Sequence, residues 1–374
     1  MRPMQDDLFG LPDPTPPAKP EKAAAGAQPD TTSPPAPQRK KSGEVLPAPV
    51  PENIQALANT LPPQLRMGVS TWSYPGWRGL VWDGDYDASV LSKNGLTAYS
   101  QHPLMRTVSV DRTFWRPLTL EQYARMAQQV PQDFRFLVKC PNVVTDALVR
   151  DENGQGQTAN PAFLSPELAV QQLVIPAVQG LGNKLGVLVF QLSPLPWQQL
   201  QRLDQVLQSL AHMLAAVRAA LAQENASHVI TAVEVRDPEF LVPALADVLR
   251  AHDSTYCLGL HGKMPGIAQQ LPVLRALWPC PLVCRWSLNR SFGPFGYPDA
   301  QAKHDPFDEI RSEDADTRHT LAKTIHGITK AGQPAFVTVS NDAEGCAPRS
   351  IALLAQAVVD WQSPAVPSEA KPST

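Results

Sequence analysis

The chain has 374 residues, of which 43% are hydrophobic and 18% are charged, so it holds enough apolar material for one large domain or two smaller ones. The formal net charge is −3, and the first 66 residues carry seven basic and seven acidic side chains, so the acidic excess lies in the rest of the chain. This balance argues against strong non-specific binding to nucleic acid, which needs a basic surface, and leaves room only for a local basic patch.

The five cysteines are an odd number and are scattered, with no histidine or second cysteine pair at zinc-binding spacing. We therefore expect reduced, buried thiols and no metal site. The sequence shows neither the apolar core of a signal peptide nor an apolar run long enough to span a membrane. We expect a cytoplasmic protein that makes no membrane contact.

Residues 1–62 have the composition of a disordered, Pro/Ala-rich tail. Residues 1–52 hold 13 of the 39 prolines, together with alanine, glutamine and charged residues. A segment of this kind cannot bury enough apolar surface to offset the entropy that it would lose on ordering. We predict one folded domain over residues 63–365 and a second, short disordered end over residues 366–374.

One short stretch breaks the composition of the tail. Gln5-Asp6-Asp7-Leu8-Phe9 places two large apolar side chains next to each other on a flexible tether, which suits docking into a partner's pocket. The stretch resembles the peptide by which bacterial replication and repair proteins bind the DNA sliding clamp; it matches at Gln5, Leu8 and Phe9 and departs at the second residue. The resemblance implies a sliding clamp as partner, and a chance Leu-Phe pair in a tail is the alternative.

After the tail, short β-branched or apolar runs alternate with helical segments. The predicted strands are residues 67–72, 106–111, 134–139, 185–192, 229–236, 256–260, 282–287 and 335–340. The predicted helices include residues 119–130, 197–223, 240–253, 267–278, 316–332 and 348–362. Eight strand–helix units in about 300 residues predict a closed (β/α)8 TIM barrel of the α/β class. The alternative, a doubly wound open sheet, is disfavoured because no glycine-rich phosphate-binding turn follows the first strand.

The predicted strands end in polar residues, and the chemistry of a TIM barrel lies at the carboxyl ends of its strands. The candidate site residues are Trp72, Tyr74, Trp77, Asp111, Lys139, Gln191, Glu234, Arg236, Arg285 and Asn341. Glu234 is the candidate general acid or base, and Lys139 is the second catalytic candidate, as an anion binder, a base or an imine former. For Glu234, a structural ion pair with Arg236 or Arg285 is an equal alternative.

The stretch GVSTWSYPGWRG, residues 68–79, follows the first predicted strand and places Trp72, Tyr74 and Trp77 among turn-forming glycines. Flat aromatic faces at a barrel mouth suit sugars or bases, and basic side chains around them suit a phosphate or carboxylate. We expect these rings to wall a ligand pocket. The alternative is that they close the top of the barrel as part of its core.

Five stretches in order, GVSTWSYPGWRG, VDRTFWRP, FRFLVKCP, GVLVFQLSP and AVEVRDPEF, resemble the marks of the YecE-like family, which is catalogued as domain of unknown function 72. The resemblance covers about residues 66–360 and implies a TIM-type barrel. It implies no activity, because none is established for the family. The fold is similar to that of sugar-isomerase and apurinic-endonuclease barrels, which is an analogy of fold and not of mechanism.

The sequence departs from the pattern of this family at several strand ends. Ser109 and Asp111 stand where the family usually has glutamate and asparagine, and Trp115 stands where it usually has tyrosine. Asp237 and Ser287 replace two common histidines. These losses weaken any metal hypothesis and raise the prospect that this member is altered or inactive.

The sequence therefore favours a hydrolase- or lyase-type, non-redox enzyme that binds a small phosphorylated or sugar-like substrate at the barrel mouth, with no cofactor assigned. Two alternatives stay open. One is a nucleic-acid processing protein of DNA repair or replication, recruited to the sliding clamp through residues 5–9. The other is a barrel that binds a ligand without turning it over.

Overall fold

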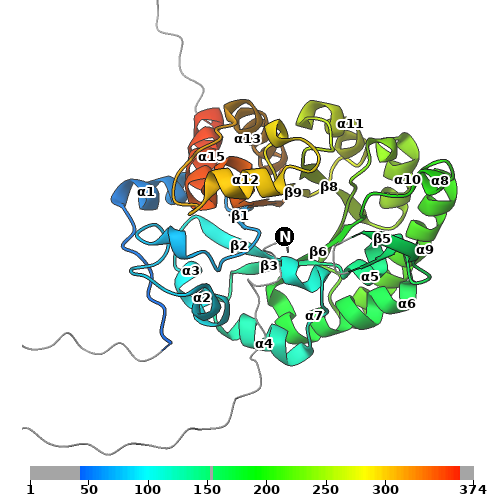
Figure 1. The fold of residues 1–374 in the computed structure, drawn as a ribbon, viewed down its shortest axis with the longest axis horizontal. Helices are drawn as coiled ribbons and strands as arrows, with labels where there is room; N and C mark the ends of the chain where they lie inside the picture. Colours follow the sequence, from blue (N-terminus) through cyan, green and yellow to red (C-terminus); the bar gives the residue numbers. More distant parts are fainter. Residues whose placement is uncertain (1–42, 152–154, 363–374) are drawn as a thin grey trace, which may run out of the picture.

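The computed structural model describes residues 43–151 and 155–362, and eight parallel strands close into a barrel inside a ring of helices (Figure 1). The strands are β1 (Leu65–Val69), β2 (Met105–Val110), β3 (Arg135–Lys139), β6 (Leu185–Gln191), β7 (Ile230–Glu234), β8 (Ser254–Leu260), β9 (Leu282–Trp286) and β10 (Ala335–Val339). They follow one another around the barrel in chain order, and β1 pairs with β10 from Leu65↔Ala335 to Val69↔Val339. The predicted TIM-type barrel is confirmed, and the open sheet is excluded because the sheet has closed on itself.

The helices outside the strands belong to the segments that follow each strand along the chain. They are α2 (Ala88–Asn94), α3 (Leu96–Tyr99), α4 (Leu120–Gln128), α5 (Asn142–Thr145), α6 (Pro166–Ala169), α7 (Ile175–Leu181), α8 (Trp197–Leu200), α9 (Leu203–Gln223), α10 (Pro243–Ala251), α11 (Ile267–Ala276), α12 (Tyr297–His304), α13 (Ala315–Lys330), α14 (Asn341–Glu344) and α15 (Ala347–Gln362). In α9, Val206, Leu210, Met213 and Val217 are buried and recur every three or four residues, so one apolar face packs on the barrel. The predicted helices are confirmed.

The predicted tail extends too far into the folded part. Residues 43–62 belong to the described structure: Val45 is buried, and helix α1 (Glu52–Thr60) lies against α15. Ile54 and Leu57 of α1 pack on the main core, which explains why this proline-flanked segment folds. The predicted C-terminal end, residues 366–374, lies outside the described residues.

The inside of the barrel is divided into an apolar layer and a polar layer. A separate cluster of buried apolar side chains includes Leu137, Val189, Ala232 and Val283. Side chains two residues apart in a strand point to the same face. The residues two positions further along these same strands are Lys139, Gln191, Glu234 and Arg285, so the polar layer lies above the apolar one, at the carboxyl ends of the strands.

The long polar insertion between the third and fourth predicted strands contains an antiparallel hairpin, β4 (Leu148–Arg150) with β5 (Gly156–Ala159). The hairpin was not predicted, because its strands are short and β5 is exposed along its whole length, so no apolar alternation marks it. It adds to the face of the molecule at which the candidate site lies.

Candidate functional site

Six side chains lie together at the carboxyl end of the barrel, and we name them the mouth cluster. It consists of Asp111, Lys139, Gln191, Glu234, Arg236 and Arg285. Five of the six are at most 8% exposed, and Asp111 is the exception with a side chain that is 28% exposed. All six were predicted from the strand ends, and the fold brings them together.

Arg285 of β9 is the centre of the hydrogen bonds in the mouth cluster. Its Nη1 donates to Glu234 Oε2 at 2.6 Å and to Gln191 Oε1 at 3.1 Å, and its Nη2 donates to an Asp111 carboxylate oxygen. Arg236 Nη2 lies 2.7 Å from Glu234 Oε1 and donates to Gln191 Oε1 at 2.9 Å. Two guanidinium groups and two carboxylates therefore balance one another inside the barrel.

Glu234 is fully buried and held in its ionised form. Burial alone raises the pKa of a carboxyl group, but the charges of Arg236 and Arg285 outweigh that effect and lower the pKa of Glu234 to about 2. Gly259 on the neighbouring strand makes room for this carboxylate, since a Cβ there would lie 3.2 Å from Glu234 Oε1. This geometry matches the alternative of a structural ion pair.

Lys139 has a different environment from the rest of the mouth cluster. Its side chain is 8% exposed, and it forms no hydrogen bond or ion pair with any of the residues that the structure describes. The ammonium nitrogen lies 3.6 Å from the centre of the Phe114 ring. Burial, followed by the charges of Arg285 and Arg236, lowers the pKa of Lys139 to about 7.

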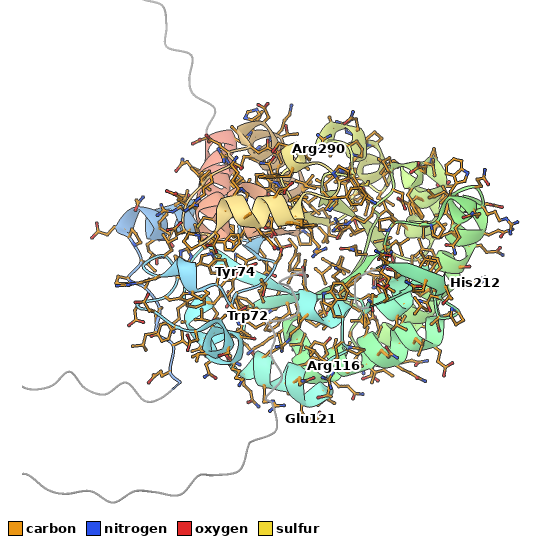
Figure 2. The ribbon with its side chains drawn as sticks, in the orientation of Figure 1. Trp72, Tyr74, Arg116, Glu121, His212 and Arg290 are labelled. Atoms are coloured by element: carbon orange, nitrogen blue, oxygen red, sulfur yellow. The ribbon has the colours of Figure 1, made fainter. Side chains whose placement is uncertain are left out.

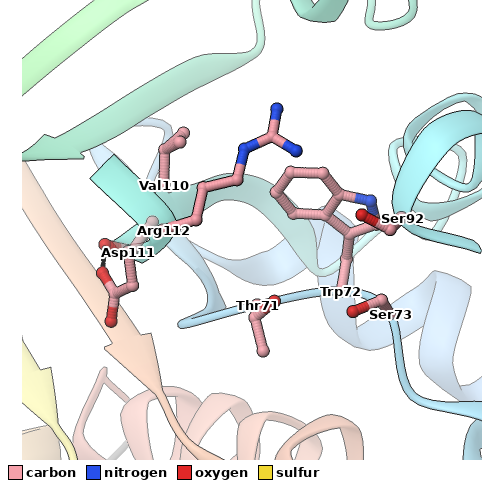
Figure 3. A pocket seen from close by; sticks show the side chains of 8 residues that line it. Thr71, Trp72, Ser73, Ser92, Val110, Asp111 and Arg112 are labelled. Atoms are coloured by element: carbon pink, nitrogen blue, oxygen red, sulfur yellow. Dashed lines mark hydrogen bonds between the residues drawn. The ribbon is translucent and has the colours of Figure 1, made fainter. Parts of the chain in front are cut away.

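Asp111 is the carboxylate of the mouth cluster that reaches open space. Ser109 Oγ donates to Asp111 Oδ1 at 2.5 Å, and Arg285 holds the other oxygen. Asp111 also lines a small cavity between the ends of β1 and β2, together with Trp72 and Arg112. In Figure 3 the Arg112 side chain extends toward the Trp72 ring, while the Asp111 carboxylate points away from both.

That cavity measures about 10 Å³, which is room for roughly one water molecule. The Arg112 guanidinium carbon lies 6.0 Å from the centre of the Trp72 ring, within the range of a cation–π contact. This cavity is thus too small for a sugar or a phosphorylated metabolite in this conformation, and a ligand of that size must displace side chains or a loop to enter it.

The three predicted aromatic residues differ in their packing. Trp72 and Tyr74 lie near the centre of the ribbon, far from His212 and Glu121 at its outer edge (Figure 2). Trp72 lines the cavity, and its Nε1 donates to the Leu91 carbonyl at 3.1 Å.

Trp77 is fully buried and stacks on Trp82 with ring centres 6.2 Å apart. Its Nε1 donates to Asn341 Oδ1 at 3.3 Å, and the same oxygen accepts from the Ala347 amide at 2.8 Å. Trp77 therefore packs inside the core, whereas Asn341 Nδ2 is buried without a hydrogen-bond partner among the described residues. The expectation that Trp77 and Asn341 face a ligand stays a prediction.

The connection between β9 and α13, residues 287–314, covers the mouth and is named the cover segment. A Cβ added to Gly76 in the loop after β1 would lie 1.8 Å from the Pro306 carbonyl oxygen, so the two backbones are in direct contact. Tyr74 packs against Phe307 with ring centres 5.2 Å apart.

The cover segment also reaches the opposite side of the mouth. A Cβ on Gly262 would lie 1.9 Å from the Gly293 carbonyl oxygen, and the Tyr297 ring lies 5.4 Å from that of His261. Tyr297 interacts with Arg236 of the mouth cluster. In Figure 1 the helix that begins at Tyr297, α12 (yellow), lies on the inner side of the helix ring.

Several buried polar atoms at the mouth have no hydrogen-bond partner among the described residues. They are the donors Arg236 Nε and Arg285 Nε, the acceptor Glu234 Oε1, and the hydroxyls Ser73 Oγ and Ser287 Oγ, which can donate or accept. The Lys139 ammonium group adds further unmatched donors. A buried donor without an acceptor is costly, so this arrangement calls for an acceptor-rich ligand or water.

The sequence profile of the family described as "Protein of unknown function DUF72" matches residues 66–373. The chain belongs to the DUF72 family. A DUF72 protein of Enterococcus faecalis is 15% identical, covers 79% of this chain and 95% of its own, and superposes with a TM-score of 0.53. A DUF72 protein of Thermotoga maritima is 17% identical, covers 78% and 98%, and has a TM-score of 0.50. At these identities the likeness shows the fold, and no curated protein matches the chain.

Four of the residues that the resemblance marked as departures are placed by the structure as follows. Asp111 supplies a carboxylate to Arg285. Asp237 accepts from the Leu195 amide at 2.8 Å and joins two loops. Ser287 is one of the buried hydroxyls without a partner among the residues described, and Trp115 is 61% exposed.

Three residues that the sequence did not single out take part in this site. Phe114 carries the Lys139 ammonium group, Tyr297 of the cover segment reaches Arg236, and burial raises the pKa of Asp342 to about 6. Phe114 lies three residues after Asp111, and Asp342 directly follows Asn341, so both stand close to candidate residues at strand ends, which is a signal that could have found them. Nothing in the sequence marks Tyr297.

His261 Nδ1 accepts from the Lys263 amide at 3.1 Å, and burial lowers the pKa of His261 to about 3. All five cysteines are free and buried. Within residues 43–151 and 155–362, no group of three or more His, Cys, Asp or Glu side chains is placed to hold a metal ion. No described helix is long and apolar enough to cross a membrane. Gln5, Leu8 and Phe9 lie outside the described residues.

Proposed function

We propose that this DUF72 barrel is a hydrolase- or lyase-type enzyme that binds a small phosphorylated or sugar-like anion at its mouth. The observation that carries the proposal is the pair of buried guanidinium Nε–H groups that have no partner among the described residues, beside a balanced ion network. Arg236 and Arg285 each keep one Nε–H free while their terminal nitrogens are held by the carboxylates. Phosphate and carboxylate oxygens are the acceptors that such donors bind best.

The ion network fixes the guanidinium groups before the ligand arrives. Glu234 contacts Arg236 and Arg285 on two sides, and Gln191 accepts from both, so neither guanidinium is free to rotate. Pre-positioned donors bind an anion without first losing side-chain entropy. We assign Glu234 this positioning role and no proton transfer, because its carboxylate is capped by two cations.

Asp111 is then the residue that carries protons in our proposal. It is the most exposed carboxylate of the mouth cluster, and Ser109 and Arg285 orient its two oxygens. Lys139 supplies the remaining positive charge, since its ammonium group has no partner among the described residues. Entry of the ligand displaces the cover segment, whose contacts to Tyr74 and His261 close the mouth.

The thermal midpoint of unfolding tests this proposal without knowledge of the reaction, because a ligand that binds the folded state raises it by mass action. The probes are glycerol 3-phosphate, dihydroxyacetone phosphate and glucose 6-phosphate, with glycerol and glucose as uncharged controls. We expect phosphorylated probes to raise the midpoint of the wild type and of Lys93→Met, an exposed control, and not that of Lys139→Met. Equal shifts in all three proteins would place binding elsewhere.

A barrel that binds its ligand without turnover is the alternative to the enzyme. Both share the binding site, so they are separated by product formation. After a probe has been found to bind, mass spectrometry of its mixture with the wild type and with Asp111→Asn measures conversion. Turnover that the substitution abolishes supports the enzyme, whereas binding without conversion supports the alternative.

We propose, as a second function, that residues 5–9 tether the barrel to a DNA sliding clamp. The support is the sequence Gln5-Asp6-Asp7-Leu8-Phe9 in a proline-rich context. Purified clamp should retain the wild-type chain in a pull-down and release a Leu8→Ala, Phe9→Ala variant. Equal retention of both chains would remove the tether, with no consequence for the barrel site.

A further inference from the structure

The charges of the mouth cluster balance one another without Lys139. Arg236 and Arg285 carry two positive charges, and Asp111 and Glu234 carry two negative ones, all four joined by contacts of 2.7 Å or less. A protonated Lys139 would be an additional, buried cation beside two guanidinium groups. Burial makes such a charge unfavourable, which shifts the equilibrium of Lys139 toward the neutral amine in the free protein.

The surroundings of Lys139 agree with this charge count. Burial and, after it, the neighbouring guanidinium groups lower the pKa of Lys139 to about 7, so this amine loses its proton more readily than an ordinary lysine does. The Phe114 ring, 3.6 Å from Nζ, favours the charged form and opposes the shift, but a single ring contact is weaker than the combined effect of burial and two cations. An unprotonated lysine next to other cations is an activated nucleophile.

The mouth also supplies what imine chemistry needs besides the amine. Lys139 is 8% exposed, so an imine formed at its Nζ is shielded from bulk water. Asp111 is oriented by Ser109 at 2.5 Å and has an exposed side-chain surface, which suits a group that passes protons to and from a reacting oxygen.

We propose that Lys139 forms a covalent imine with the carbonyl carbon of a phosphorylated aldehyde or ketone; this inference rests on the anion site of the proposed function. The Nζ lone pair attacks the carbonyl carbon and the carbonyl oxygen becomes a hydroxyl. Proton transfer through Asp111 converts that hydroxyl to water, which leaves as the C=N bond forms. The free Nε–H groups of Arg236 and Arg285 hold the phosphate. The protonated imine then withdraws electrons from the neighbouring carbon, which is the chemistry of a lyase.

Borohydride reduction tests the proposal, because hydride converts the imine to a stable secondary amine that peptide mass mapping locates. The probe is dihydroxyacetone phosphate with the full chain at pH 7.5, and dihydroxyacetone is the matched probe without phosphate. We expect the adduct on Lys139 with the phosphorylated probe and at least tenfold less of it with the other. Glycerol 3-phosphate, which has no carbonyl group, should prevent the adduct by occupying the site.

Lys139→Arg separates the imine from the anion site, since arginine keeps a positive charge but no nucleophilic amine. It should retain a thermal shift with dihydroxyacetone phosphate and give no adduct at position 139. If the probe shifts the wild type but Lys139 stays unmodified after reduction, the imine is wrong and the anion site stands. If the probe neither shifts the wild type nor modifies Lys139, both proposals fail. The glycerol 3-phosphate competition in wild type keeps the test valid if the variant does not fold.

Discussion

Arg285 Nη1 lies 2.6 Å from Glu234 Oε2 inside the barrel, where both side chains are almost completely shielded from solvent. Removing one partner of a buried ion pair leaves the other uncompensated, which costs about 3–5 kcal/mol. We predict that Glu234→Gln lowers the free energy of unfolding by this amount, measured by chemical denaturation at pH 7. Asp253→Asn is the control, since the Arg218–Asp253 pair is exposed on its acidic side and should contribute less than about 1 kcal/mol. Similar losses in the two variants would contradict the ion network described here.

The lowered pKa of Lys139 predicts how the stability of the folded chain depends on pH. This pKa is about 7 in the folded chain, against 10.5 for an unperturbed lysine, so between these values the unfolded chain binds more protons. Stability from this group therefore rises with pH, by at most about 1.4 kcal/mol per pH unit. Lys139→Met should exceed the wild type in stability at pH 7, and this excess should shrink by pH 9. Lys93→Met should match the wild type at both values, and an unchanged excess at pH 9 would refute the low pKa.

The close contact between Gly76 and Pro306 leads to a prediction about how the cover segment is held. A Cβ on Gly76 would lie 1.8 Å from the Pro306 carbonyl oxygen, so Gly76→Ala must push the cover segment away at a cost of about 1–3 kcal/mol. Hydrogen exchange of residues 304–308 should become faster. Gly327→Ala in α13 is the matched control, because open space surrounds that position and the change should stabilise the helix by about 0.5–1 kcal/mol. Unchanged exchange in Gly76→Ala would mean that this contact does not hold the cover segment.

The burial of Trp77 and the exposure of Trp115 predict a large and a small effect of truncation on stability. Trp77 is fully buried, so Trp77→Ala should cost about 3–5 kcal/mol of unfolding free energy. Trp115 is 61% exposed, and Trp115→Ala should change stability by less than about 0.5 kcal/mol. Denaturant midpoints of the two variants check this. A small loss of unfolding free energy in Trp77→Ala would contradict a core role for Trp77 and favour the pocket wall that the sequence predicted.

The strand ends could be predicted from the sequence because the two-residue period of a strand is local. The step from Leu137 to Lys139, or from Val283 to Arg285, is visible in the printed letters. The ion-pair partners could not be predicted in this way. Arg285 meets Glu234 and Asp111 because of the registers of separate strands and the closure of the barrel. Sequence therefore identified the members of the mouth cluster, and only the fold showed that Lys139 is the one without a partner among the described residues.

The cover segment shows a second limit of prediction. Its contacts to Gly76, Gly262 and Tyr74 join loops that are far apart in the chain and carry no periodic pattern. The burial of Trp77 could not be predicted for the same reason, because it depends on how the loop after β1 packs against Trp82 and Asn341. Residues 43–62 were assigned to the tail on their prolines, because composition does not show that Ile54 and Leu57 find a core to pack on.

Proton uptake on ligand binding tests the central claim most directly, because an anion held by Lys139 must favour its charged form. Glycerol 3-phosphate is titrated calorimetrically at pH 8 into the wild type and Lys139→Met, in two buffers that differ in ionisation enthalpy. We predict that the wild type takes up close to one proton per bound anion, by the linkage of the two equilibria, and that the variant takes up none. Binding with no proton uptake, or with the same uptake in both proteins, would contradict an anion site at Lys139.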